Sequence, residues 1–237
     1  ISRLLGYLRD VLIAVFLGTS LLADVFFIAF RIPNTFRRLF AEGTFNAAFV
    51  PSYTSELAKS KSKSKRFANE IFSLLLLGLM FLVLVIEIFM PVFISLIAPG
   101  FVEDKKKIEL AIDLTRITFP FLMFVSLSSF FAAILNSHNK FAAASAAPII
   151  LNIVLIIILI FGNYLGDDLI YFMSYGVSLA GFLQLIFLNK FVKKFHSVKF
   201  NLKVRINNKV KFFFKKLLPS MFSSGVTQRN ILVGTII

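Results

Sequence analysis

Long apolar runs recur along the chain, with short polar stretches between them. The longest runs are residues 71–98, 119–135, 148–161 and 169–188. Each run approaches the roughly 20 residues that a helix needs to cross ~30 Å of hydrocarbon. Within a run the apolar residues are continuous rather than alternating, which favours membrane helices over the strands of a β-barrel. The pattern therefore predicts an all-α integral membrane protein, a polytopic helical bundle.

The polar stretches divide the chain into six predicted membrane helices and the beginning of a seventh. Pro33 and Gly43 are expected to break the second helix, because proline removes a backbone hydrogen bond and glycine weakens a helix. The predicted helices cover residues 3–17, 22–58, 67–97, 108–136, 146–161 and 169–192, and the seventh begins near Leu217. The expected domains are an N-terminal lobe of six transmembrane helices over 1–194, a basic cytoplasmic surface linker over 195–216, and the start of a second lobe over 217–237.

Composition supports the membrane assignment, because 58% of the residues are hydrophobic, against about 45 to 50% in a typical soluble domain. The net charge of +14 is concentrated in two basic loops, residues 59–66 and 190–216. Short loops rich in lysine and arginine stay on the cytoplasmic side of a membrane. We therefore place both loops in the cytoplasm. Their charge is interpreted as a topology signal that contacts membrane lipids, with no nucleic acid as a partner.

The sequence lacks the residue sets of several kinds of catalytic site. It contains no cysteine, which excludes disulfides, thiol catalysis and Cys-ligated metals. It also has no Ser/His/Asp set, Gly-rich phosphate loop or metal-ligand spacing, and His138 falls in a polar turn where we expect it to be solvated. We therefore predict that the protein is not an enzyme and has no catalytic residues, metal or cofactor.

The beginning of the chain is apolar enough to enter a bilayer, yet its first 45 residues carry eight charged side chains. A charge near the centre of a membrane helix costs about 2.5 to 3.5 kcal/mol on insertion scales. A chain that keeps several such charges is therefore predicted to use them on a polar cargo. The eight are Arg3, Arg9, Asp10, Asp24, Arg31, Arg37, Arg38 and Glu42.

Helical spacing gathers these charges on common faces. Arg3 and Asp10 are seven residues apart, so they lie about 20° from each other on a helix that turns about 100° per residue. In the next helix the charges recur after seven, seven and four residues, at Asp24, Arg31, Arg38 and Glu42. The two helices are therefore predicted to share one charged pocket.

An excess of arginine in that pocket suits an anionic ligand. The guanidinium group matches phosphate oxygens with paired hydrogen bonds and stays charged, so a diphosphate is the natural candidate. The acids are expected to orient the arginines in the empty site and to act as a gate. The predicted substrate-binding residues are Arg3, Arg9, Arg31, Arg37 and Arg38, and the predicted gating or ion-pair residues are Asp10, Asp24 and Glu42.

Two other interpretations of the charges stay open. Buried ion pairs can lock two helices together without binding a ligand, although structural pairs usually balance their charges. A proton or ion pathway through Asp10 and Asp24 also fits the pattern, either alone or beside cargo binding.

Several short segments, taken in order, resemble a known family. They are SRLLGYLRD (2–10), DVFFIAFRIPN (24–34), RRLFAEG (37–43), FVP (49–51), APGF (98–101), TFP (118–120) and ILN (134–136). Together they resemble the MurJ (MviN) family of lipid II flippases, which belongs to the multidrug/oligosaccharidyl-lipid/polysaccharide exporter superfamily. The resemblance covers nearly the whole chain.

That resemblance implies the first lobe of a two-lobe alternating-access transporter in the bacterial cytoplasmic (inner) membrane. The implied cargo is lipid II, the undecaprenyl-diphosphate-linked disaccharide-pentapeptide, moved from the cytoplasmic to the outer leaflet. Arg3, Arg9 and Arg37 match arginines that the family needs, and Asp10 and Asp24 match acids that line or gate its cavity. Lipid II, membrane lipids and cell-wall synthesis proteins are the implied partners. Because the chain opens and stops inside apolar segments, we expect it to be the N-terminal half of a longer protein.

Two rival functions are kept beside this one. The first is a flippase or exporter of another polyprenyl-diphosphate sugar in the same superfamily. The second is a membrane scaffold that transports nothing, in which the ion pairs serve only to lock helices together. A scaffold should tolerate exchange of the two charges of a pair, whereas a flippase should not.

Overall fold

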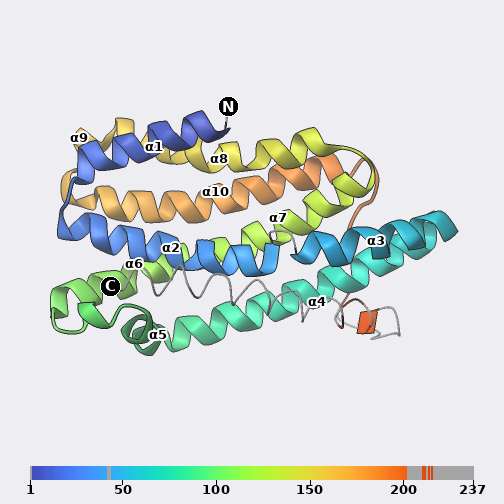
Figure 1. Ribbon diagram of the computed structural model, residues 1–237, viewed down its shortest axis with the longest axis horizontal. Helices are drawn as coiled ribbons and strands as arrows, with labels where there is room; N and C mark the ends of the chain where they lie inside the picture. Colours follow the sequence, from blue (N-terminus) through green and yellow to red (C-terminus); the bar gives the residue numbers. More distant parts are fainter. Residues whose placement is uncertain (1, 42–43, 202–209, 212, 214, 216–237) are drawn as a thin grey trace. The chain divides into compact units, whose positions relative to one another are not determined.

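The computed structural model describes residues 2–41, 44–201, 210, 211, 213 and 215. The regular elements of that part of the chain are all helical, which confirms the all-α prediction (Figure 1). The α-helices are α1 (Ser2–Leu17), α2 (Leu21–Ala41), α3 (Thr44–Lys59), α4 (Lys61–Ile88), α5 (Met90–Ile97), α6 (Lys105–Thr118), α7 (Pro120–Ser137), α8 (Phe141–Ile160), α9 (Gly162–Leu165) and α10 (Leu169–Val192). Short 3-10 turns follow α5 and α9, namely η1 (Pro99–Phe101) and η2 (Gly166–Asp168).

Four segments are long and apolar enough to cross a membrane: Lys61–Ile88, Lys105–Ser137, Phe141–Ile160 and Leu169–Val192. Each overlaps a predicted membrane helix. The second segment contains both α6 and α7, which are separated by Phe119. These segments confirm an integral membrane protein. The division into six spans, a linker and a second lobe stays a prediction, and most of the linker and all of residues 217–237 lie outside the described residues.

Two helix interruptions differ between the prediction and the structure. We expected Pro33 to interrupt the second helix, but α2 continues through it as one element. Membrane helices tolerate an internal proline because neighbouring groups satisfy the carbonyl that proline leaves without a partner. Conversely, the helix predicted over 67–97 is divided between α4 and α5, since Pro91 stands in the first turn of α5, where its missing N–H costs nothing.

The basic segment 59–66 is helical rather than the loop that we predicted. The helix α3 ends at Lys59 and α4 begins at Lys61, so Ser60 alone joins them. The Ser60 hydroxyl accepts a hydrogen bond from the backbone N–H of Lys63 at 3.2 Å. A serine in this position satisfies one of the free N–H groups at a helix start, which explains how two helices meet through one residue.

Contacts divide the chain into two compact units. The first contains Ile1–Asn34, Leu82–Phe124 and Ala146–Gln184. The second contains Thr35–Phe81, Val125–Ser145 and Leu185–Ile237. Each unit therefore joins segments that are far apart in the sequence, and each is described below by itself.

Close helix contacts hold the first unit together. A Cβ atom on Gly181 of α10 would lie 2.7 Å from Cδ2 of Phe121 in α7, so the two helices approach at a point where only glycine fits. The Thr118 hydroxyl of α6 donates a hydrogen bond to the Ala29 carbonyl of α2 at 2.7 Å. Small residues and hydroxyl bonds of this kind are the usual contacts between membrane helices, where no hydrophobic effect drives association.

Aromatic side chains form the core of the second unit. Phe49 of α3 lies between Phe130 of α7, at 5.1 Å between ring centroids, and Phe67 of α4, at 5.9 Å. Phe213 adds an edge contact to Phe45 at 5.7 Å. All of these side chains are buried. Aromatic pairs at such separations stabilise a core beyond the area that they bury.

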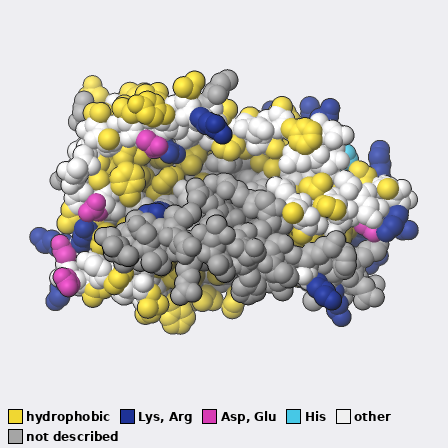
Figure 2. Space-filling model, in the orientation of Figure 1, with side chains coloured by type: hydrophobic (Ala, Val, Ile, Leu, Met, Phe, Trp, Pro, Cys, Tyr) yellow, Lys and Arg dark blue, Asp and Glu magenta, His cyan; other side chains and the backbone are white. Residues whose placement is uncertain are grey.

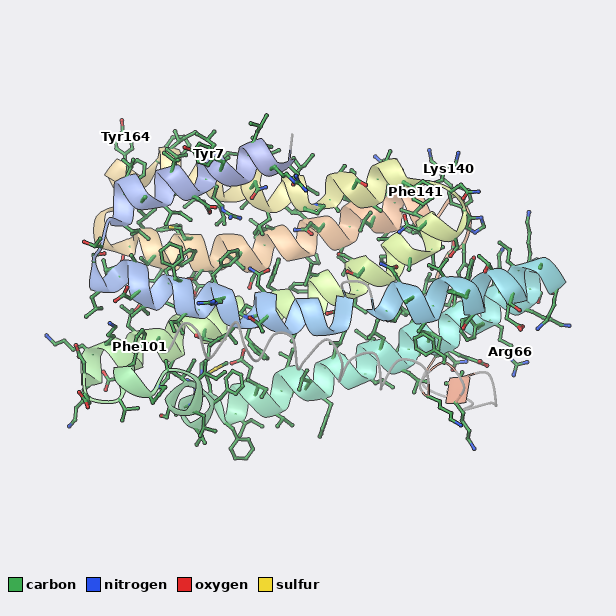
Figure 3. All side chains as sticks on the ribbon, viewed as in Figure 1. Tyr7, Arg66, Phe101, Lys140, Phe141 and Tyr164 are labelled. Atoms are coloured by element: carbon green, nitrogen blue, oxygen red, sulfur yellow. The ribbon has the colours of Figure 1, made fainter. Side chains whose placement is uncertain are left out.

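Large apolar side chains are exposed on the outer helices of the first unit. In α1, Leu4 is 73% exposed and Val15 is 69% exposed. Tyr7 of α1 and Tyr164 of α9 also point away from the helices (Figure 3). Contiguous apolar surface is rare on soluble proteins but is expected where lipid covers it. These faces are therefore the lipid-facing side of the unit.

Candidate functional site

The first unit contains five of the eight predicted site residues, Arg3, Arg9, Asp10, Asp24 and Arg31. The backbones of Arg37 and Arg38 belong to α2 in the second unit, and their side chains lie outside the described part of the structure. Glu42 lies outside the described residues altogether. One shared pocket for all eight stays a prediction.

Arg9 contacts three other side chains of the unit. Its Nη1 donates to Oδ1 of Asn152 in α8 at 2.9 Å, and its Nε and Nη2 donate to Oδ1 of Asp10 at 3.0 and 2.7 Å. The guanidinium carbon lies 5.7 Å from the centre of the Phe30 ring in α2, within the range of a cation–π contact. Arg9 thus joins α1 to α2 and to α8, beside which α1 runs (Figure 1).

Burial separates Arg9 from the other charges of α1. The Arg9 side chain is 16% exposed, whereas that of Asp10 is 62% exposed. Arg3 is also exposed, and Figure 2 shows acidic and basic side chains near each other over α1 within a mainly apolar surface. The seven-residue spacing predicted Arg3 as the neighbour of Asp10, but the contact that the structure gives Asp10 is with the adjacent Arg9.

Asp24 forms a second interhelical ion pair. The Lys107 ammonium of α6 lies 3.0 Å from Oδ2 of Asp24 and 4.3 Å from the centre of the Phe101 ring (Figure 3 labels Phe101). Asp104 caps α6 by accepting hydrogen bonds from the backbone N–H groups of Lys106 and Lys107 at 3.0 and 3.1 Å. The cap fixes the first turn of α6, and so directs Lys107 toward α2.

Arg31 stands next to the ring that Arg9 covers. It follows Phe30 in α2, its side chain is half-buried, and it makes contacts within the structure. The spacing of seven residues predicted that Arg31 and Asp24 share a face, and the described partner of Asp24 is Lys107 instead. Arg9 and Arg31 of the first unit are therefore both partly buried.

Polar contacts of the second unit involve neutral histidines. His138 shares a hydrogen bond of 3.2 Å with the Tyr53 hydroxyl and stacks on Phe195 at 4.6 Å. Burial, with a smaller contribution from the charge of Lys61, lowers the pKa of His138. The prediction that His138 is solvated was wrong, because the turn after α7 folds the ring against two aromatic side chains instead of exposing it.

His196 connects the segment after α10 to α4. Its Nε2 donates to Oδ1 of Asn69 at 2.9 Å, and the same oxygen accepts from the backbone N–H of Lys199 at 3.0 Å. Burial, followed by the charge of Lys65, lowers the pKa of His196 from 6.5 to about 4. The imidazole is therefore neutral at physiological pH, as its buried position requires.

Three partners of the charged residues were not predicted from the sequence: the uncharged side chains of Asn152 and Phe30, and the partner of Asp24. One signal for Asn152 was present, because it is an amide in the middle of the apolar run 148–161. A polar residue inside a membrane span usually faces other helices. Lys107 carried no comparable signal, since it belongs to the polar segment between the helices predicted over 67–97 and 108–136.

No group of three or more His, Cys, Asp or Glu side chains that could hold a metal ion occurs among the residues described. The contacts with Asn152, Asp10 and Phe30 hold the Arg9 guanidinium group in a fixed orientation within an apolar unit. Such a group binds carboxylate or phosphate oxygens strongly, because its N–H groups form a planar fork and cannot lose their charge.

Comparisons with known proteins point to one family. The family model described as "Lipid II flippase MurJ" matches residues 13–237. The chain is 41% identical to the probable lipid II flippase MurJ of Rhizobium tropici, over 98% of this chain and 45% of that protein. It is 40% identical to the protein of the same name from Rickettsia prowazekii (strain Madrid E), over 99% of this chain and 46% of that protein. The chain therefore spans about half the length of these relatives.

Solved structures agree with the sequence comparison. The structure titled "Lipid II flippase MurJ, inward closed conformation" is similar with a TM-score of 0.80 and 30% identity, over 98% of this chain and 47% of that chain. A transporter of the MOP superfamily from Pyrococcus furiosus has a TM-score of 0.66 and 17% identity, over 94% of this chain and 50% of that chain. The second likeness concerns the fold alone.

Proposed function

Because the chain belongs to the lipid II flippase MurJ family, we propose that the protein moves lipid II from the cytoplasmic to the outer leaflet of the bacterial inner membrane. The chain supplies one lobe of an alternating-access transporter. Its cargo carries a diphosphate between the lipid and the sugar, and the arginines bind that group. In this proposal the basic segments 59–66 and 190–216 face the cytoplasm, and the protein itself catalyses no reaction.

The observation that supports this proposal best is the environment of Arg9. A guanidinium group that is 16% exposed, inside a unit with lipid-facing apolar helices, is costly unless it acts on something. Its partners from the described residues are one exposed carboxylate, one neutral amide and one aromatic ring. Since only the carboxylate carries opposite charge, and since that carboxylate is largely in solvent, the site keeps a positive potential for an anionic ligand.

The proposal assigns roles to the remaining charges. Arg3, Arg31, Arg37 and Arg38 are proposed to extend the anion site beyond Arg9. Asp10 and Asp24 are proposed to release Arg9 and Lys107 when cargo arrives, so that ion pairs are exchanged for contacts with phosphate. Such an exchange couples cargo binding to a change in helix contacts, which an alternating-access cycle requires.

Complementation tests the function. The full-length protein and its variants are produced at equal levels in bacteria depleted of their own lipid II flippase. Wild type is expected to restore growth, and Arg9→Ala and Arg37→Ala are expected to fail. The matched control is Arg66→Ala, which removes an exposed arginine that pairs with Glu70 within α4, and which should restore growth like wild type.

Two results would contradict the proposal. Growth with all variants would mean that the arginines do not handle cargo, and it would favour a structural role for the charges. Failure of every variant, wild type included, would point to another cargo, such as a different polyprenyl-diphosphate sugar. Transport of fluorescent lipid II in vesicles separates the second case from poor function in the host.

A further inference from the structure

Asn152 is a buried amide in an otherwise apolar helix. It is 6% exposed and lies in the candidate membrane span Phe141–Ile160. Burying an amide in such surroundings costs free energy unless its donors and acceptor find partners. In the structure Oδ1 accepts from Arg9 Nη1 at 2.9 Å, and Nδ2 donates to the Ser2 carbonyl at 3.2 Å. Both ends of the amide are thus bound to α1.

The two contacts fix α1 against α8. Ser2 and Arg9 are two turns apart, but side chains on a helix lean toward its N-terminus, so the long Arg9 side chain returns toward Ser2. One amide can therefore meet both groups. Gly6 lies between them, and a Cβ atom there would be 3.8 Å from Asn152 Nδ2, so α1 runs close to the amide over this stretch. The contacts define both the rotation of α1 and its position along α8.

Asn152 differs from Asp10 in what it does to the guanidinium group. The pair with Asp10 joins neighbouring residues, and its carboxylate is 62% exposed, so it is weak and screened by solvent. The bond to Asn152 is shielded, because the amide is buried. It also leaves the positive charge of Arg9 intact, because an amide is neutral. Asn152 can therefore orient the guanidinium group without reducing its attraction for an anion.

Arg9 keeps N–H groups for a ligand. A guanidinium group has five N–H donors, and the hydrogen bonds to Asn152 and Asp10 use Nη1, Nε and Nη2 once each. The remaining N–H on Nη1 and on Nη2 has no partner among the residues that the structure describes. These two donors are available to phosphate oxygens, which guanidinium N–H groups bind in paired hydrogen bonds.

We propose that Asn152 is a positioning residue, which holds the Arg9 guanidinium group in the orientation that binds the diphosphate of the cargo. The proposal rests on the proposed function, in which Arg9 binds that diphosphate. It adds that affinity depends on an uncharged residue of α8 that does not itself contact the cargo. Because Asn152 acts through Arg9, its contribution should vanish when Arg9 is absent.

A double-mutant cycle tests this dependence. The probe is undecaprenyl diphosphate, and its affinity is measured for the full-length protein in lipid nanodiscs. We expect Arg9→Ala to weaken binding about a hundredfold, and Asn152→Leu, which is similar in size, to weaken it about tenfold, or about 1.4 kcal/mol. Arg9→Ala/Asn152→Leu should bind as weakly as Arg9→Ala alone. Two independent residues would instead give the product of both losses.

Ser178→Ala serves as the matched control, because it removes another interhelical hydrogen bond of the same unit, between Ser178 and the Ile117 carbonyl. It should leave affinity unchanged, and thermal unfolding of each variant reports any loss of fold. The positioning role would be overturned if the losses of affinity multiplied in the double variant. It would also be overturned if Asn152→Leu kept full affinity while Arg9→Ala bound weakly. Both results would leave the diphosphate site itself supported. Equal affinity in all variants would overturn the site and the positioning role together.

Discussion

In the first unit, two cationic side chains reach from one helix to another, whereas two cationic side chains described in the second unit pair with an acid on their own helix. Arg9 of α1 contacts Asn152 of α8, and Lys107 of α6 pairs with Asp24 of α2. Both contacts cross between helices that are far apart in the sequence. They therefore depend on the fold, and any movement of a helix changes them.

The second unit uses charge locally. Lys59 pairs with Glu56 three residues away in α3, and Arg66 pairs with Glu70 four residues away in α4. Contacts between elements are made there by hydrogen-bonded side chains such as His196 with Asn69. Under the proposed function, the unit in which charged side chains reach between helices is the one that acts on the ligand.

Exchange of the two charges in a pair tests this contrast most strongly. Arg9→Asp/Asp10→Arg keeps one cation and one anion next to each other, but it removes the guanidinium group from the amide of Asn152 and from the Phe30 ring. We expect complete loss of complementation by the full-length protein. The corresponding exchange in α4, Arg66→Glu/Glu70→Arg, should support normal growth. Growth with the first exchange would favour a scaffold held together by ion pairs.

Acid should weaken the second unit through His196. Burial beside Lys65 lowers the pKa of this side chain from 6.5 to about 4. Between those two pH values the unfolded chain binds more protons than the folded one, so stability is complete above about pH 6.5 and falls as the pH drops toward 4. The full effect is about 3 kcal/mol, at about 1.4 kcal/mol for each unit of pKa.

Thermal unfolding of the full-length protein in detergent, at about pH 7 and about pH 4.5, measures this effect. His196→Gln cannot titrate but keeps a donor for Asn69, so it should lose less stability on acidification than wild type. His138→Gln is the comparison variant, since burial lowers the pKa of this histidine as well, and its replacement should reduce the pH response in the same direction. If His196→Gln lost as much stability on acidification as wild type, titration of His196 would not be the cause of the loss.

The smallest effect is expected from the interhelical pair of Lys107 with Asp24. Lys107→Met removes the charge that pairs with Asp24, whose side chain is 60% exposed, and should cost about 0.5 kcal/mol. The measurement is thermal unfolding at low and high salt. Salt screens exposed pairs, so wild type and variant should converge as salt rises. A loss of stability several times larger, or one independent of salt, would show that the pair stabilises the unit more than a solvent-screened ion pair can.

Regular features of the fold were predictable from the sequence. The helix predicted over 169–192 has the same bounds as α10, because its apolar run is long and has clear polar limits. The polar face of α1 was predictable too, since helical spacing depends only on the chain itself. Helix ends that depend on a single residue were less predictable. An example is the junction of α3 and α4 at Ser60.

Partners of the charged residues could not be predicted in the same way. Spacing tells which side chains share a face, but it does not tell which helix lies opposite. The amide that contacts Arg9 is 143 residues away along the chain, and Lys107 is 83 residues from Asp24. Local periodicity contains no information on contacts between residues so far apart in the sequence. The family resemblance therefore indicated which arginines matter, and the structure showed which residues contact them.

The length of α4 has a consequence for the bilayer in which the protein works. Its 28 residues extend about 42 Å at about 1.5 Å per residue, against ~30 Å of hydrocarbon. The excess is comparable to the basic first turns, Lys61 to Arg66, which can stay among the headgroups while the mainly apolar remainder spans the interior. A membrane a few ångströms thicker or thinner would then be accommodated by helix tilt and by flexible lysine side chains, without drawing the basic groups of the first turns into the hydrocarbon.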